Sequence, residues 1–207
     1  MKSVISSLNL RFLSPVIIAF CFGVLVSLGA CSSQTITDVA SRKPALKLEE
    51  YFEGDVIAYG IFEDYSQSLS RQFRVNIKGI VEGNQLTLEE DFLYDDGEEQ
   101  RRVWVITNLG TDEDGITRYE GRADDVVGTA IGEVAGNALH WRYTLALPVG
   151  DDVYHVQFDD WIYQQDEYVA INRAKLTKFG IPIGSVTLSF LRGPAAEAIG
   201  PLDMKNW

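Results

Sequence analysis

From Gly54 to Leu191 the chain repeats one pattern, in which segments of about ten residues with alternating apolar and polar side chains are separated by turn residues. The segments are rich in Val, Ile, Tyr, Phe and Trp, and no amphipathic helix of comparable length interrupts them. Alternation with a period of two places one face of each strand in a core and the other in solvent. The pattern therefore predicts an all-β chain folded as an antiparallel meander.

Two turns in the first half predict the register of three strands. Gly83-Asn84 fits a two-residue hairpin loop, and Asp95-Asp96-Gly97 fits a three-residue loop with glycine in the left-handed position. Counting outward from these loops gives one shared face, made of the pairs Val81–Leu86, Gly79–Leu88, Ile77–Glu90, Val75–Phe92, Phe73–Tyr94, Leu86–Ile106, Leu88–Trp104 and Glu90–Arg102. This face is apolar apart from Glu90 and Arg102, so both turns indicate the same inner side.

The second half gives a similar inner face. Loops at Gly136-Asn137 and Gly150-Asp151 predict the pairs Val134–Leu139, Gly132–Trp141, Ala130–Tyr143, Gly128–Leu145, Leu145–Val156, Tyr143–Phe158, Trp141–Asp160 and Leu139–Ile162. A four-residue turn from Gln164 to Glu167 would then place Ile171 opposite Asp160 and Arg173 opposite Phe158. The face again carries one acid, Asp160, with Arg173 on its diagonal.

Sequential pairing with one apolar face predicts a closed up-and-down barrel of about eight to ten strands, lipocalin-like in architecture. A two-sheet sandwich is the alternative.

The interior of the predicted barrel would hold two acid–base pairs, Glu90 with Arg102 and Asp160 with Arg173, among large aromatic side chains. Because a buried charge is costly unless it is paired, we expect Arg102 or Arg173 to hold the anionic head of an amphipathic ligand. The apolar part of that ligand would lie against Trp104, Trp141, Tyr143, Phe158 and Phe92. Structural ion pairs in a filled barrel are the alternative interpretation.

The N-terminus has the parts of a lipoprotein signal peptide. Basic Lys2 and Arg11 precede an apolar stretch from Phe12 to Leu28, which leads into Leu28-Gly29-Ala30-Cys31. Cleavage before Cys31 would make it the new N-terminus, and its thiol would be lipidated. An uncleaved membrane anchor is the alternative, because the apolar stretch is almost long enough to span a bilayer. Ser32 and Ser33, with no Asp after the cysteine, favour the outer membrane. We expect a signal peptide at residues 1–30, a lipidated tether at 31–47 and a barrel domain at 48–207, facing the periplasm.

Composition limits the function classes. The net charge of −12 makes nucleic-acid binding improbable, since phosphate backbones would be repelled. Cys21 would leave with the signal peptide and Cys31 would carry lipid, so no disulfide, thiol chemistry or cysteine-metal site is expected. The Asp112-Glu113-Asp114-Gly115 segment lacks the remaining ligands of a calcium loop and is interpreted as a turn. We therefore expect no metal and no cofactor.

Catalysis lacks support in the sequence. The predicted registers place both histidines, His140 and His155, on outward faces, and no nucleophile elbow, zinc-binding helix or phosphate loop is present. We expect a protein that is not an enzyme.

Several segments resemble a family of bacterial lipoproteins, the domain-of-unknown-function family 3833. The resemblance rests on Ala123–Gly128, Asn137–Tyr143, Asp159–Tyr163, Ile171–Lys175 and Lys178–Gly180, and it would cover nearly the whole mature chain. It provides no established catalytic or binding residues. Members tend to be encoded near lipid-modifying enzymes of the cyclopropane-fatty-acid-synthase type, which implies a role in envelope lipid. The architecture is also similar to lipocalins, although their Gly-x-Trp signature is missing here.

These observations lead us to expect an outer-membrane lipoprotein, held by its N-terminal lipid, whose barrel binds or shields a fatty acyl or other amphipathic ligand. The alternative is a non-enzymatic interaction module with a packed barrel that holds another envelope protein. An outward Trp161, beside His140, motivates this alternative, because exposed tryptophan is common at binding hot spots.

Overall fold

A computed structural model of the chain describes residues 33–207 except residue 151. Within these residues, ten strands and three short helices follow one another in sequence. In order they are η1 (Ile36–Val39), α2 (Leu48–Phe52), β1 (Gly54–Asp64), β2 (Leu69–Glu82), β3 (Gln85–Tyr94), β4 (Glu99–Thr111), β5 (Thr117–Arg122), β6 (Ala130–Ala135), β7 (Ala138–Val149), β8 (Asp152–Gln164), β9 (Val169–Lys178), β10 (Ile181–Arg192) and α3 (Pro194–Ile199). None of the helices in this part of the chain has the length and apolarity needed to span a bilayer.

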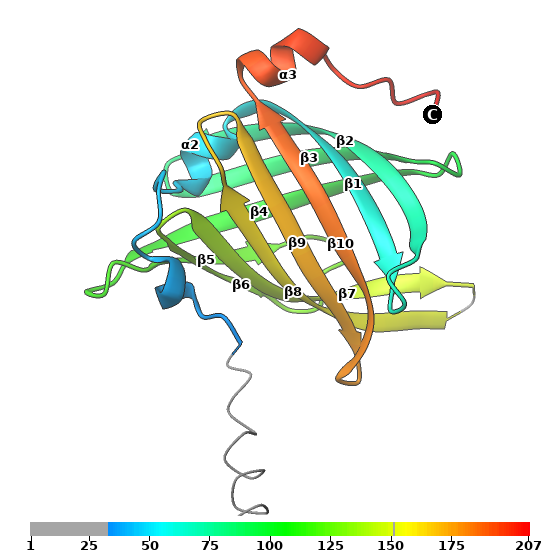
Figure 1. Ribbon diagram of the computed structural model, residues 1–207, viewed down its shortest axis with the longest axis horizontal. Helices are drawn as coiled ribbons and strands as arrows, with labels where there is room; N and C mark the ends of the chain where they lie inside the picture. The colour runs from blue at the N-terminus through cyan, green and yellow to red at the C-terminus, as the bar shows by residue number, and fades with distance from the viewer. Residues whose placement is uncertain (1–32, 151) are drawn as a thin grey trace, which may run out of the picture. The chain divides into compact units, whose positions relative to one another are not determined.

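The strands form a closed barrel in which every strand pairs antiparallel with its neighbours in sequence, and β1 pairs with β10 to complete the ring (Figure 1). Closure leaves no free sheet edge, which separates this architecture from a two-sheet sandwich. The predicted up-and-down barrel is therefore confirmed, at the upper end of the expected strand number.

The registers predicted from the two turns of the first half are confirmed. Ile77 lies opposite Glu90 across β2 and β3, and Glu90 lies opposite Arg102 across β3 and β4. The pairs of β7 with β8 are also as predicted, with Tyr143 opposite Phe158 and Trp141 opposite Asp160. Short loops with glycine at a left-handed position leave few alternative pairings, which is why these registers were accessible from sequence.

The β6–β7 register is confirmed only near its turn. Gly132 lies opposite Trp141, whose indole covers it so closely that a Cβ on Gly132 would overlap the ring. Beyond Ile131 the ladder ends, and Val126, rather than the predicted Gly128, forms a bridge with Leu145. Residues 123–129 therefore connect β5 and β6 as an irregular segment that lies against β7.

The predicted β8–β9 register is wrong by three residues. Asp160 lies opposite Ala174, not Ile171, and Arg173 lies opposite Trp161, not Phe158. The Asp166 carboxylate accepts hydrogen bonds from the backbone N–H groups of Tyr168 and Val169, each at 2.8 Å, and these bonds stabilise a longer turn than the predicted one. An odd shift exchanges the two faces of a strand, so Arg173 points outward and Asn172 points inward.

One end of the barrel is sealed by α2. Leu48, Tyr51 and Phe52 are only 1–2% exposed and pack against inward residues of β1 and β2. Gly79 on β2 permits this contact, because a Cβ there would overlap the Phe52 carbonyl group. We call the part of the interior next to α2 the sealed half. The open half is the part nearer the β1–β2, β3–β4, β7–β8 and β9–β10 turns, at the other end.

The segments that precede the first strand and follow the last strand in the sequence cover parts of the outer wall of the barrel. Ile36 and Val39 of η1 are buried against Trp161 and Ala138, so the compact unit begins at Thr35. Residues 35–47, which the sequence assigned to a tether, thus include ordered structure on the barrel. After β10, α3 and the segment to Trp207 contact the outside of β1 and β2 (Figure 1).

Candidate ligand-binding site in the barrel interior

Aromatic rings line the middle of the barrel. The ring centroid of Trp104 lies 5.8 Å from that of Trp141 and 5.4 Å from that of Tyr143, both in edge-to-face geometry. Tyr143 in turn stacks on Phe158, with centroids 4.9 Å apart and an interplanar angle of 10°. These four side chains come from β4, β7 and β8, as the registers predicted, and they form a continuous aromatic wall.

Arg102 points into the barrel but its main partner was not predicted. Its guanidinium group donates to Asp125 through Nη2 at 2.6 Å and through Nε at 3.0 and 3.2 Å. Asp125 belongs to the β5–β6 connection, which is fixed to β7 by hydrogen bonds from Ala146 N–H to the Asp125 carbonyl group and from Val127 N–H to the Thr144 carbonyl group. A bidentate pair of this kind is among the stronger polar contacts in proteins.

Glu90 faces Arg102 across the β3–β4 pair, yet no hydrogen bond to its carboxylate occurs among residues 33–150 and 152–207. Burial raises the pKa of Glu90 to about 7, and the nearby Asp125 and Asp160 carboxylates also raise it, while Arg102 lowers it. Glu90 and Arg102 are therefore close enough to interact electrostatically but share no hydrogen bond. The guanidinium group of Arg102 is hydrogen-bonded to Asp125 instead.

Asp160 has neutral partners. It accepts hydrogen bonds from Tyr143 Oη at 3.2 Å and from Asn172 Nδ2. Burial raises the pKa of Asp160 to about 6, although both hydrogen bonds lower it. The predicted pairing of Asp160 with Arg173 is wrong, since the exposed Arg173 lies on the outer face and Asn172 occupies the inward position.

The interior is accessible from the open half. The side chains of Arg102 and Asp125 keep 15% and 24% exposure although both lie inside the wall. Partial exposure is shared by other inward residues of this half, namely Glu90, Tyr94, Tyr143, Phe158, Asp160, Val186 and Leu188. In the sealed half the corresponding positions, such as Leu86 and Leu139, are buried. Solvent therefore reaches the charged cluster.

Two clefts of about 420 and 380 Å³ lie along the outer wall instead. The larger is lined by Tyr59, Arg74 and Trp207, and the smaller by Asp91, Arg101 and Met204, together with neighbouring residues. Both lie where the C-terminal segment crosses the barrel. They do not include the aromatic wall or the inward charges.

The chain matches the family described as "Protein of unknown function (DUF3833)" over residues 25–192. The chain belongs to this family. No curated protein matches it. Among solved structures, an S-type phycobiliprotein lyase, CPES from Guillardia theta, is similar with a TM-score of 0.56 and 8% identity, over 78% of this chain and 98% of that one. At this identity the likeness concerns the fold, which places this DUF3833 chain in the same barrel architecture.

Some predicted sites of this DUF3833 member lie elsewhere than expected. Trp161 is only 9% exposed, because η1 covers it, so the prediction of an exposed tryptophan is wrong. His140 stacks on Trp161 with centroids 4.1 Å apart. The Trp161 indole N–H donates to Asp159 Oδ1 at 3.1 Å, and His140 Nε2 lies 3.1 Å from the same oxygen. Burial lowers the pKa of His140. Cys31 and the signal peptide lie outside the described residues.

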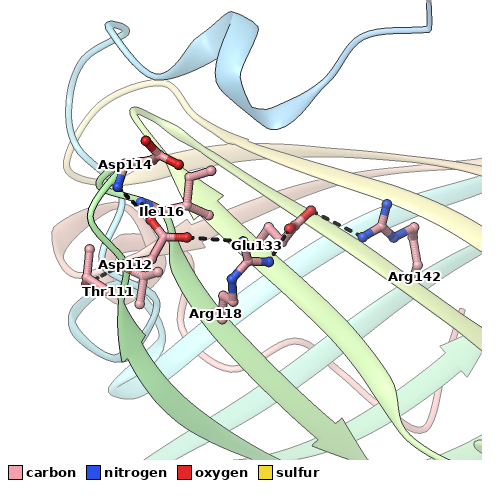
Figure 2. Close-up of polar contacts among 8 residues, drawn as sticks. Thr111, Asp112, Asp114, Ile116, Arg118, Glu133 and Arg142 are labelled. Atoms are coloured by element: carbon pink, nitrogen blue, oxygen red, sulfur yellow. Dashed lines mark hydrogen bonds and ion pairs between the residues drawn. The ribbon is translucent and has the colours of Figure 1, made fainter.

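The acidic turn between β4 and β5 is a structural turn, as predicted. Asp112 accepts hydrogen bonds from the N–H groups of Asp114 and Ile116 and from Arg118, which in turn pairs with Glu133 at 2.6 Å (Figure 2). Arg142 joins Glu133 from the other side at 3.2 Å, as Figure 2 shows. Across the part of the chain that the structure describes, no group of three or more His, Cys, Asp or Glu side chains is arranged to hold a metal ion.

Sequence reasoning missed two residues of the cluster, Asp125 and Asn172. Asp125 lies on an irregular segment for which no hairpin rule gives a register. Asn172 was hidden by the wrong β8–β9 turn, although a signal existed: Arg173 and Lys175 alternate on one face, and Ala170, Ala174 and Leu176 on the other. Two cations on one face indicate solvent, which would have placed Asn172 inside.

Proposed function

We propose that this protein binds an amphipathic small molecule in the open half of its barrel. The polar end of the ligand would lie among Glu90, Arg102 and Asp160, and the apolar part against Tyr143 and Phe158. One observation carries the proposal: charged side chains that remain partly exposed are enclosed by an aromatic wall inside a barrel. A barrel that served only as a scaffold would be more stable with apolar residues at these positions.

The fold comparison supports a ligand-binding role in general terms. The similar solved structure is named as an S-type phycobiliprotein lyase, and at 8% identity the likeness concerns the fold. Among the inward residues that the structure describes, no serine, threonine or cysteine is hydrogen-bonded to a histidine or a carboxylate, so we propose binding or shielding rather than catalysis.

The location of the protein is part of the proposal. Cleavage before Cys31 and lipidation of its thiol would anchor the barrel to the outer membrane, facing the periplasm. Because the compact unit begins at Thr35, only a few residues would separate the lipid from the barrel. Such a short link would hold the barrel close to the membrane surface, where amphipathic ligands are concentrated.

The alternative of an interaction module loses its main motivation, because Trp161 is covered by η1 and is not available to a partner. A contact with an envelope protein stays a prediction of the sequence. Crosslinking in intact cells would test it.

Native mass spectrometry of the protein purified from its own envelope tests the proposed function. We expect a bound small molecule whose recovery falls when Phe158 is replaced by Ala, and stays unchanged when the outward Gln157 is replaced by Ala. Repeated recovery of the empty protein, by native mass spectrometry and by lipid extraction, would refute the proposal.

The anchor is tested separately by Cys31→Ser. Labelling with radioactive palmitate should disappear in the variant, while the circular dichroism spectrum of the barrel should not change, because the change lies before the compact unit. Equal labelling of both proteins would contradict the lipoprotein assignment.

A further inference from the structure

Within the described residues, the two guanidinium groups that point into the open half or lie at its mouth, those of Arg102 and Arg71, already have carboxylate partners. Arg102 is held by Asp125 in bidentate geometry. At the rim, Arg71 lies over the Tyr94 ring at 3.8 Å and pairs with Asp96 at 2.7 Å and Glu98 at 3.0 Å. A ligand carboxylate or phosphate would have to displace one of these intramolecular partners.

Two carboxylates of the interior, those of Glu90 and Asp160, form no ion pair with a cation of the described residues. Glu90 lacks a hydrogen-bond donor within the described residues, and Asp160 is bonded only to the neutral groups of Tyr143 and Asn172. With Asp125 included, three inward carboxylates surround one guanidinium group. Within the described residues no ion pair joins Glu90 or Asp160 to a cation, so carboxylates outnumber guanidinium groups in this cluster.

Aromatic faces accompany these two acids. Tyr143 donates to Asp160 and stacks on Phe158, and the Phe92 ring already has the Arg102 guanidinium group 5.4 Å from its centroid. Rings next to carboxylates form the environment that recognises organic ammonium groups, because the ring face and the acid both attract positive charge. The same environment disfavours an anion.

We infer that the polar end of the ligand is a cation, an amine or quaternary ammonium group attached to an apolar chain or ring, and that Glu90 is its principal partner. This inference rests on the proposed function, since it assigns the charge of the ligand in the same site. It reverses the sequence-based expectation of an anionic head group held by Arg102.

Three amphiphiles with the same alkyl chain test this inference: an alkyltrimethylammonium ion, the fatty acid and the alcohol. Each is titrated into the purified protein at about pH 8, above the pKa of about 7 that burial gives Glu90, so that this carboxylate is ionised; binding is followed by calorimetry and by tryptophan fluorescence. We expect the ammonium probe to bind at least about tenfold more tightly than either of the others, which corresponds to one favourable charge interaction. Glu90→Gln should bring its affinity down to that of the alcohol.

Neighbouring outward residues provide matched controls. Glu89→Gln and Asp159→Asn remove the same charges from the same strands but from the outer face, and they should leave the affinity for the ammonium probe unchanged. If the ammonium probe loses affinity equally in Glu89→Gln and Glu90→Gln, the attraction is a general effect of net charge and the inference is wrong.

The outcomes separate this inference from the proposed function. Tight binding of the fatty acid that is lost in Arg102→Met would overturn the cationic assignment and leave a ligand site in place. Failure of all three probes to bind would contradict the proposed function itself.

A pH titration of the unmodified protein replaces the variant if Glu90→Gln does not fold. The quaternary ammonium probe has no titrating proton, so its affinity should fall as the pH is lowered and Glu90 and Asp160 become protonated, with Arg102, Asp125 and Tyr143 also facing the probe. Affinity that is constant or that rises towards acid pH would contradict the inference.

Discussion

The two halves of this barrel differ in how their interior is filled. In the sealed half, α2 fills the end of the barrel, and the Phe52 ring lies 5.0 Å from Tyr51 and 5.2 Å from Phe190. In the open half, the corresponding volume is occupied by charged and aromatic groups that solvent still reaches. The difference indicates that stability is concentrated at one end, which allows the other end to keep groups that weaken the fold.

The largest expected effect concerns this contrast directly. Phe52→Ala should lower the free energy of unfolding by about 3–5 kcal/mol, because the cavity at a sealed end cannot fill with water or collapse easily. Phe158→Ala, a comparable truncation in the partly exposed half, should cost only about 1–2 kcal/mol. Urea denaturation of both variants measures the difference. Equal losses would show that the two halves are packed alike.

A second prediction concerns the Arg102–Asp125 pair. Arg102→Met leaves the Asp125 and Glu90 carboxylates without their cation and should destabilise the protein by about 3 kcal/mol. Combining it with Asp125→Leu and Glu90→Leu should restore most of that loss, since apolar groups would replace the whole charged set. Thermal or urea denaturation of the single and triple variants provides the measurement. A triple variant no more stable than Arg102→Met would show that the charges support the fold beyond their mutual pairing.

The third prediction is a pH dependence of stability. The pKa of Glu90 rises from its ordinary value of 4.5 to about 7 in the folded protein, so the folded state binds more protons than the unfolded state between these values. The free energy of unfolding should therefore fall as the pH rises from 4.5 to 7, by about 2–3 kcal/mol from this group, and Asp160 should act in the same direction. Glu90→Gln should flatten this part of the profile, and Glu89→Gln should not. A profile that is unchanged in Glu90→Gln would contradict the burial of this acid.

The smallest effect is expected at Arg173. Its side chain is exposed on the outer face, so Arg173→Ala should change the free energy of unfolding by less than about 0.5 kcal/mol and leave probe binding unaltered. Chemical denaturation and one probe titration are sufficient. A loss of several kcal/mol would instead support the inward position that the predicted register gave.

How well the strand registers of each region could be predicted depends on the turns that join the strands. Where two or three residues join two strands, glycine and asparagine leave essentially one geometry, and the pairs Glu90–Arg102 and Trp141–Asp160 could be derived from sequence. The longer turn after Gln164 is stabilised by the Asp166 side chain, which a count of turn residues does not include. Asp125 reaches Arg102 through an irregular connection, and no periodicity encodes that contact.

The burial of Trp161 under η1 also could not be predicted from the alternation of the strands. Alternation correctly placed this residue on the outer face, but it could not reveal that Ile36 and Val39 return to pack on that face. In an isolated barrel, a side chain that points outward is also exposed to solvent. Once a flanking segment folds back onto the wall, an outward side chain can be buried. The same reasoning explains why residues 35–47 were assigned to a tether.

The β5–β6 connection has a kinetic consequence. Residues 123–129 are attached to β7 by a small number of backbone hydrogen bonds, whereas the neighbouring β7–β8 ladder extends over twelve residue pairs. Amide protons in such a segment exchange with solvent through local opening, without unfolding of the whole domain. Each opening would carry Asp125 away from Arg102 and interrupt the wall beside Leu145. Hydrogen exchange should therefore be fastest here among the interior-facing segments.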